Sequence, residues 1–294
     1  MRIVRSIDEL RASLADQRRG GARIGLVPTM GAFHAGHLSL MRRARADCDV
    51  VVVSLFVNPA QFNEAGDLAA YPRAEGRDVG LAEQAGVDVL FAPPVDEMYP
   101  PGFATTVSVS GLSEVLEGAA RGRKHFDAVA TVVAKLFNAA GPDVAYFGQK
   151  DAQQALLIQR MVRDLAFPVQ IEICPTIREA DGLAMSSRNA RLSASDRSRA
   201  GALHRSLEVV RRAVAGGERD PAAARAQALA ELSAAGVEPD YLELVTPDGL
   251  APVQRIEADV LALVAARVGE TRLIDNQLIH PLSIVRSASD NGRG

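Results

Sequence analysis

The feature that most constrains the fold is a series of short apolar runs in the first 175 residues. These runs are rich in valine, isoleucine and leucine, and they read RIGLVPT, DVVVVSLFVN, VDVLFAPP, DVAYFG and VQIEICP. Within them apolar and polar residues do not alternate, which is typical of parallel strands that are covered on both faces. The segments between them have helical patterns and are long enough for crossover helices. The sequence therefore predicts an α/β fold with a doubly wound parallel sheet.

The chain changes character after Arg178, where alanine, arginine, leucine and glutamate dominate. Two segments, SASDRSRAGALHRSLEVVRRAVAGG and DPAAARAQALAELSAAG, begin with residues that cap helices and end in glycine. Three strand-like pieces follow, DYLELVT, DVLALVAARV and TRLIDNQLI. We therefore predict a first domain over residues 1–178, a smaller α+β C-terminal domain over 179–282, and a disordered tail over 283–294.

One further segment, TTVSVSG at residues 105–111, does alternate between polar and apolar residues. Alternation of this kind is typical of a strand with one face exposed. We expect a strand here, outside the parallel sheet.

Charge and composition narrow the classes of partner. The 294 residues include 33 Lys and Arg against 36 Asp and Glu, a net charge of -3, so no general positive field draws the chain to nucleic acid or to a membrane surface. No apolar run has the length of a membrane span or the form of a signal peptide. Cys48 and Cys174 lack metal-type spacing, which favours free thiols in a reducing compartment. We expect a cytoplasmic protein whose partners are small molecules.

The stretch PTMGAFHAGH, residues 28–37, follows the first of the apolar runs and leads into a helix. Ligands of open α/β sheets collect beyond the carboxyl ends of strands, where helix N-termini bind phosphate. Gly31 permits a tight turn, and we expect Gly36 to let a ligand approach closely. His34 and His37 would face the same side of the first helical turn. The pair suits a phosphate, although partly buried packing histidines explain it equally well, and a zinc site lacks a third ligand nearby.

Two later stretches carry similar chemistry. In FGQKDAQQ, residues 147–154, Lys150 gains nothing from the positive end of the helix that follows, so binding of an anion explains it better than helix stabilisation. In READGLAMSSRN, residues 178–189, Ser186, Ser187 and Arg188 together offer hydroxyls and a guanidinium fork that match a triphosphate. The alternative for the second stretch is a capped turn that opens the next helix.

The motifs together resemble a known family. HAGH resembles the HIGH motif of the nucleotidyltransferase superfamily, and MSSRN resembles the counterpart of its KMSKS loop. The run VPTMGAFHAGHLSLMRRAR, with SLFVNPAQF, HFDAVATVVAKLFN, YFGQKDAQQ and READGLAMSSRN, closely resembles the pantothenate synthetase (pantoate–β-alanine ligase) family over nearly the whole chain, up to DNQLI. The resemblance implies a Rossmann-like, HIGH-type N-terminal domain.

The resemblance also implies a reaction. The family joins pantoate to β-alanine with ATP in two steps: pantoate and ATP form a pantoyl-adenylate and pyrophosphate, and β-alanine then displaces AMP. Magnesium would accompany ATP, and the family forms homodimers. The sequence offers no activated serine or cysteine nucleophile, which agrees with a reaction that needs no covalent enzyme intermediate.

Site residues follow from the same resemblance. The catalytic positions are His37, His34, Lys150 and Arg188. The ATP contacts are Met30, Gly31, Ala32, Phe33, His34, Ala35, Gly36, His37, Gly148, Gln149, Lys150, Asp151, Ile177, Met185, Ser186, Ser187 and Arg188. His37 matches the position usually assigned as a proton donor; we favour hydrogen bonding to phosphoryl oxygens over literal proton transfer.

The substrate and metal positions complete this set. Gln61 and Gln154 match positions that hold pantoate. Neutral amides would orient its carboxylate without lowering its nucleophilicity, as a tight ion pair would. Asp78 matches an outer-sphere partner of magnesium, although the basic neighbour Arg77 argues against that role.

The chain departs from the family pattern at ARGRKHFDAV, where Arg121–His125 lacks a proline and has room for one extra residue. We expect a more mobile and more basic loop there, with Arg123 and Lys124 solvated.

Alternative functions are weaker. Another HIGH-type adenylyltransferase would not need Gln61 and Gln154, and a tRNA synthetase would need a larger and more basic C-terminal region. A nucleotide-binding module without catalysis would be expected to lack one of His37, Lys150 and Arg188.

Overall fold

The computed structural model describes residues 1–63 and 65–281, so the predicted tail at 283–294 lies outside the described residues. In these ranges six strands form one parallel sheet in the order β1-β4-β3-β2-β5-β6. The strands are β1 (Arg2–Val4), β2 (Ile24–Thr29), β3 (Val50–Leu55), β4 (Val89–Phe91), β5 (Val144–Gly148) and β6 (Gln170–Cys174). The parallel sheet predicted from the apolar runs is confirmed, and β1 is an edge strand that the sequence analysis missed.

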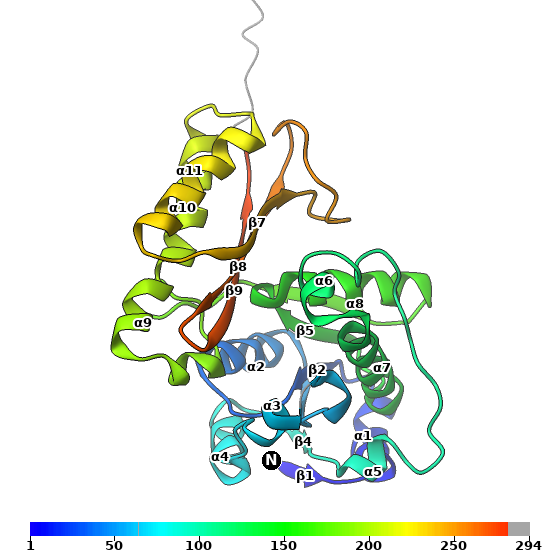
Figure 1. Ribbon diagram of the computed structural model, residues 1–294. Coiled ribbons are helices and arrows are strands. Elements are labelled where there is room, and N and C mark those ends of the chain that lie inside the picture. The colour runs from blue at the N-terminus through cyan, green and yellow to red at the C-terminus, as the bar shows by residue number, and fades with distance from the viewer. Residues whose placement is uncertain (64, 282–294) are drawn as a thin grey trace, which may run out of the picture.

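Helices cover both faces of this sheet (Figure 1). The helices α1 (Ile7–Arg19), α7 (Arg123–Ala140) and α8 (Ala152–Asp164) share one apolar cluster, whereas α2 (Ala35–Asp47) and α4 (Glu75–Gln84) share another. Successive residues of β2 belong to different clusters, Leu26 to the first and Val27 to the second, and both are buried. Burial on both faces is the physical reason why polar and apolar residues do not alternate in these runs.

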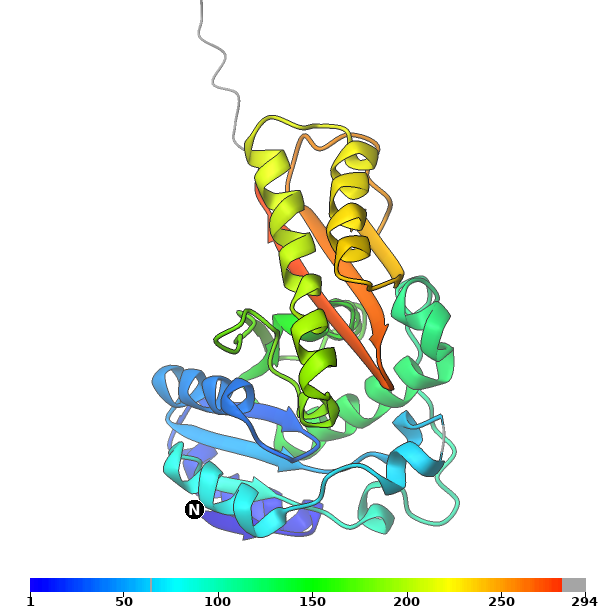
Figure 2. The same ribbon diagram turned by 60° about the vertical axis from the view of Figure 1, so that its left-hand side comes forward.

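The C-terminal part is built on an antiparallel sheet of β7 (Pro239–Val245), β8 (Val260–Val268) and β9 (Thr271–Ile279). Figure 2 shows α10 (Ala202–Ala215) and α11 (Pro221–Ala234) lying along this sheet, with α9 (Ala194–Ala200) leading into them. Ser193 and Asp220 cap α9 and α11 through their side chains. The smaller α+β domain is therefore confirmed, while the boundary at residue 178 stays a prediction.

The remaining short elements connect these layers. They are η1 (Pro59–Gln61), α3 (Ala65–Ala69), α5 (Val95–Met98), α6 (Glu117–Arg121), η2 (Gln149–Asp151) and η3 (Ser187–Arg191). Among the described residues no helix combines the length and the apolar character that crossing a membrane would require.

Residues 105–111 do not form a strand, so that prediction was wrong. Val107 and Val109 pack against the larger apolar cluster, which accounts for the alternation. The Val107 amide donates to Thr131 Oγ1 at 2.9 Å, so a side chain of α7 takes the place of a neighbouring strand. Alternation reports one buried side, and a helix can cover that side as well as a sheet can.

The segment Arg121–His125 is also more regular than expected. Only Gly122, with φ +82°, separates α6 from α7. Lys124 is exposed, and Arg123 donates to Ser108 Oγ at 2.9 Å. The segment is a helix junction where a loop was expected, its mobility stays a prediction, and both basic side chains are exposed as predicted.

Candidate active site

The site lies where the order of strands reverses. The neighbours β2 and β5 sit at the centre of the sheet, and the chain continues from them to opposite edges, through β3 and β6. In doubly wound sheets this switch point opens a crevice at the carboxyl ends of the strands. The loop after β2 and the turn η2 after β5 therefore reach the same crevice.

A buried carboxylate shapes the loop after β2. Asp78, in the first turn of α4, is 1% exposed, and its two oxygens accept the backbone N–H groups of Ala32 at 2.7 Å and Phe33 at 2.8 Å. Gly31 has φ +84°, the left-handed conformation that glycine adopts without strain. Asp78 thus fixes the turn into α2. Amides occupy both of its oxygens and the side chain does not line the cavity, and its expected role beside magnesium stays a prediction.

His34 and His37 form one hydrogen-bonded unit at the start of α2. His34 is the N-cap, and its Nδ1 accepts the Gly36 amide at 3.2 Å. The Nδ1 of His37 accepts the His34 amide at 3.4 Å, and the two ring centroids are 4.2 Å apart. Because a backbone amide can only donate, we assign the proton of each neutral ring to Nε2.

Gly36 serves this unit in a way that the sequence did not indicate. A Cβ at this position would lie 2.9 Å from Cε1 and 3.0 Å from Nδ1 of His34. The glycine therefore makes room for the capping imidazole, and the expectation that it also lets a ligand approach stays a prediction.

Both histidines are held neutral. Burial, followed by the charge of His34, lowers the pKa of His37 to about 3. Burial also lowers the pKa of His34, and the nearby Lys150 adds to the effect. Near neutral pH each ring is consequently a hydrogen-bond donor through Nε2 and carries no charge.

The turn η2 supplies a cation to the same crevice. Lys150 Nζ lies 3.3 Å from Asp151 Oδ1, and the lysine side chain is 19% exposed. Burial acts to raise the pKa of Asp151, but the charge and hydrogen bond of Lys150 prevail and lower it. Asp151 stands at the N-cap position of α8 without a capping hydrogen bond from its side chain, so it is free to take part in the site.

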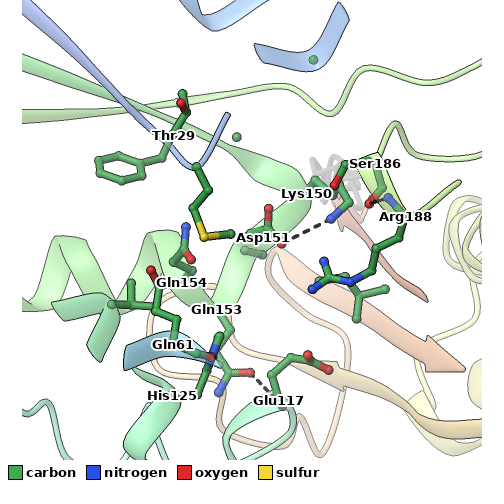
Figure 3. A pocket seen from close by; sticks show the side chains of 18 of the residues that line it. Thr29, Gln61, Glu117, His125, Lys150, Asp151, Gln153, Gln154, Ser186 and Arg188 are labelled. Atoms are coloured by element: carbon green, nitrogen blue, oxygen red, sulfur yellow. Dashed lines mark hydrogen bonds and ion pairs between the residues drawn. The ribbon is translucent and has the colours of Figure 1, made fainter. Parts of the chain in front are cut away.

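The loop after β6 closes the crevice from the other side. Arg178 and Ala184 pair as an isolated bridge, and the Met185 amide donates to Ile177 O at 2.9 Å. Ser186 Oγ accepts the Arg188 amide at 3.2 Å and so caps η3. The capped turn posed as an alternative by the sequence is therefore present, and its side chains also line the cavity, so phosphate binding by the same loop stays a prediction. Figure 3 shows Lys150, Asp151, Ser186 and Arg188 gathered on one side of the pocket.

One cavity of about 590 Å³ joins these segments. Among the sequence-predicted residues, the structure brings together Met30, His34, Gly36, His37, Gln61, Gly148, Lys150, Asp151, Gln154, Ile177, Met185, Ser186, Ser187 and Arg188. The cavity lining does not include Gly31, Ala32, Phe33, Ala35 or Gln149. Phe33 is 1% exposed because it packs under α2, and its amide is taken by Asp78. These five belong to the turns that support the cavity, and their predicted contacts with ATP stay a prediction.

Gln61 and Gln154 lie on the opposite side of the cavity from Arg188 (Figure 3). His125 Nδ1 lies 2.8 Å from the carbonyl oxygen of Gln61, so the start of α7 holds η1 in place. Burial lowers the pKa of His125 despite the opposing effect of that carbonyl.

Sequence reasoning missed several cavity residues on this side. Buried Asn58 caps η1, and its Oδ1 also accepts Tyr99 Oη–H at 2.9 Å. An apolar wall comes from one stripe of α7, formed by Phe126, Val129, Val132, Val133 and Leu136. The helical spacing of these residues was the available signal for the wall, since it marks one face of a helix.

We compared the sequence and the structure with those of known proteins. The family model described as pantoate-beta-alanine ligase matches residues 2–278. The chain belongs to the pantoate-beta-alanine ligase family. The chain is 55% identical over 275 residues to a pantothenate synthetase of Cereibacter sphaeroides, covering 93% of this chain and 98% of the relative.

Solved structures agree with this membership. Pantothenate synthetase from Thermus thermophilus matches with a TM-score of 0.91 and 48% identity, over 96% of this chain and 100% of that one. Pantoate-beta-alanine ligase from Francisella tularensis, complexed with beta-gamma ATP and beta-alanine, matches with a TM-score of 0.77 and 33% identity, over 95% and 97% of the two chains. The chain is thus a ligase that condenses pantoate with β-alanine, using ATP and passing through a pantoyl-adenylate, with release of AMP and pyrophosphate.

Proposed function

We propose that both steps of the ligase reaction take place in the cavity between the parallel sheet and the small domain. The observation that carries this proposal is that His34, His37, Lys150 and the segment Ser186–Arg188 line the same cavity as the two glutamines. Donors for a triphosphate and neutral amides for a hydroxy acid thereby lie within reach of one another.

The phosphate side suits adenylation. A carboxylate oxygen of pantoate attacks the α-phosphorus, a new P–O bond forms, and the bond to pyrophosphate breaks with its electron pair leaving on oxygen. Lys150, Arg188 and the Nε2–H groups of His34 and His37 donate to the oxygens on which charge collects. Because both rings are neutral, we assign them hydrogen bonding and no proton transfer. Loss of Lys150 or Arg188 should cost about 3–4 kcal/mol of transition-state stabilisation.

The opposite side suits pantoate. Gln61 and Gln154 can orient its hydroxyls and carboxylate, and the wall of α7 can pack against its methyl groups. The uncharged amides leave the carboxylate nucleophilic. In the second step the free amine of β-alanine attacks the acyl carbon of the adenylate, the acyl–oxygen bond breaks, and AMP leaves.

Magnesium would enter with ATP, held mainly by phosphate oxygens and water. Among the described residues no group of three or more His, Cys, Asp or Glu can hold a metal ion, which suits a metal carried by its nucleotide. Asp151 lines the cavity beside Lys150, which supports a role for its carboxylate near the metal.

The broader setting is also part of the proposal. We propose a homodimer, a division into domains at residue 178, and a cytoplasmic location, for which the buried free thiols of Cys48 and Cys174 are suited.

A coupled assay tests the reaction and the site together. AMP release should require ATP, pantoate and β-alanine, and pyrophosphate release should require only ATP and pantoate. AMP release that continues without pantoate would overturn the assignment. Lys150→Met should abolish pyrophosphate release, whereas the matched Lys124→Met, at an exposed position on α7, should leave it unchanged; equal activity of the two variants would exclude Lys150 from the site.

A further inference from the structure

Strand β9 of the small domain reaches the turn that carries Lys150. The β8–β9 hairpin extends onto the parallel-sheet domain in Figure 2. Asn276 on β9 is 3% exposed, and its Nδ2 donates to the carbonyl oxygens of Gln149 and Lys150, each at 2.9 Å. Its Oδ1 accepts Gln149 Nε2 at 3.0 Å. The carboxamide of Asn276 therefore binds the turn η2 through three hydrogen bonds and has no hydrogen left for another acceptor.

The preceding residue holds the other phosphate-binding segment. Asp275, also 3% exposed, accepts Arg178 Nη1 on Oδ2 at 2.6 Å and Arg178 Nη2 on Oδ1 at 3.1 Å. The guanidinium also donates to Gly182 O at 3.1 Å. Since Arg178 pairs with Ala184 at the base of the loop, this forked ion pair fixes the point from which the loop extends to Arg188.

Two consecutive side chains thus support two segments that are far apart in sequence. We propose that Asn276 and Asp275 are positioning residues for adenylation, the first through Lys150 and the second through Arg178 and the loop of Arg188. This inference rests on the proposed roles of Lys150 and Arg188. A phosphate-binding group displaced by about 1 Å can lower the rate about 100-fold, so the stiffness of both supports matters to the chemistry.

The burial of both side chains explains why they can act as supports. A buried hydrogen-bonding group that loses its partner keeps its desolvation penalty, so the turn cannot relax to a different contact without loss. Through these hydrogen bonds the small domain holds the segments that carry the charged groups of the cavity.

Asn276→Leu, which keeps the approximate volume and removes the hydrogen bonds, tests the first support. We expect kcat/KM for ATP in pantoate-dependent pyrophosphate release to fall about 100-fold. The matched control is Gln277→Leu: Gln277 is the next residue of β9, and its Nε2 donates away from the cavity, to Glu208 of α10 at 2.7 Å. The control should lose stability without loss of kcat/KM.

A double-mutant cycle separates positioning from general damage. ATP binding is measured by equilibrium titration for all four proteins of the cycle. Asn276→Leu should weaken binding in the wild-type background but by about threefold or less in the Lys150→Met background, because its effect acts through the missing lysine. A full additive loss in that background, or wild-type kcat/KM for Asn276→Leu alone, would overturn the inference. If Lys150→Met alone were fully active, the proposed function of Lys150 would fail first.

Asp275→Asn provides a second variant, should Asn276→Leu not fold. It keeps the shape of the side chain and removes the charge that holds Arg178. We expect Asp275→Asn to raise the KM for ATP and to leave the KM for pantoate unchanged. Asp275→Glu, which keeps the charge, should partly restore ATP binding. Equal changes in both KM values would contradict a role confined to the phosphate segments.

Discussion

The backbone amide of His34 donates to Nδ1 of His37 at 3.4 Å, so the two histidines of the HAGH stretch are hydrogen-bonded to each other. His34 in turn accepts the Gly36 amide at 3.2 Å. The resulting arrangement exposes Nε2–H of each ring as the hydrogen-bond donor and uses Nδ1 to fix its orientation.

The activity of a His37 variant should therefore depend on which ring nitrogen the new side chain replaces. His37→Gln places an amide donor near the position of Nε2, whereas His37→Asn places one near Nδ1. We expect His37→Gln to retain more pyrophosphate release than His37→Asn, by about tenfold, the equivalent of one retained neutral hydrogen bond. Single-turnover pyrophosphate release measures the difference. Equal loss in both variants would favour proton transfer by the imidazole.

The same burial predicts a dependence of stability on pH. The pKa of His37 is about 3 in the folded chain against an ordinary value of 6.5, so between these values the unfolded chain binds a proton that the native chain does not. Stability should therefore fall as pH falls from 6.5, by at most about 1.4 kcal/mol per pH unit for this group.

Urea unfolding of the wild type and of His37→Gln measures this effect. The slope between pH 6.5 and 4.5 should be shallower in the variant, because it lacks the imidazole whose pKa differs between the folded and unfolded chains. The range ends at pH 4.5 because Glu117 titrates below that value in the unfolded chain of both proteins. Identical slopes in the two proteins would show that His37 is not held neutral.

Gly36→Ala should disrupt the histidine unit. The added Cβ would lie 2.9 Å from Cε1 of His34, so the ring must leave its capping position. We expect a loss of about 1 kcal/mol of stability from the cap and a larger loss of ATP affinity. Gly80→Ala in α4 is the matched control, since nothing lies within 4 Å of its Cβ, and it should stabilise the protein by about 0.5–1 kcal/mol.

Asp78→Asn distinguishes a support of the loop from a partner of the metal. The asparagine can accept one of the two amides of Ala32 and Phe33 and presents a donor to the other. We expect a loss of about 1–3 kcal/mol in the free energy of unfolding, measured without magnesium. The magnesium concentration for half-maximal activity should not change; a shift in that midpoint with stability unaltered would restore the metal role.

Glu117 of α6 forms an ion pair with Arg272 of β9 in the small domain. It is 6% exposed, and its oxygens accept Arg272 Nη1 at 2.8 Å, Arg272 Nη2 at 2.7 Å and Arg121 Nε at 2.8 Å. Burial acts to raise the pKa of Glu117, but the two guanidinium groups prevail and lower it to about 2. Its contribution to stability is therefore present above pH 4.5 and is lost as pH falls from 4.5 to 2.

Glu117→Gln should remove about 3–5 kcal/mol of stability at neutral pH, because two guanidinium groups lose their buried counter-charge. The matched Glu114→Gln removes an exposed ion pair with Arg123 and should change stability by about 0.5 kcal/mol or less. Thermal and urea unfolding compare the two variants, and similar values would show that the Glu117 cluster does not hold the domains together.

Local patterns in the sequence were sufficient for the elements and for the principal site motifs. The apolar runs predicted the parallel strands because each is buried on both faces, and Ser193 and Asp220 marked helix starts because their side chains satisfy amides within a few residues. The strand predicted at residues 105–111 is absent, because periodicity indicates that one side of a segment is buried but does not indicate whether a sheet or a helix covers that side.

What the sequence by itself predicted was which residues gather at one site: the histidine pair, Lys150 and the Ser186–Arg188 loop all line the cavity. Only the tertiary structure decided what holds them there. Asp78 meets a loop 45 residues earlier, and Asn276 meets a turn 126 residues earlier. Hydrogen bonds over such separations depend on strand order and domain packing, and the spacing of residues along the chain encodes neither.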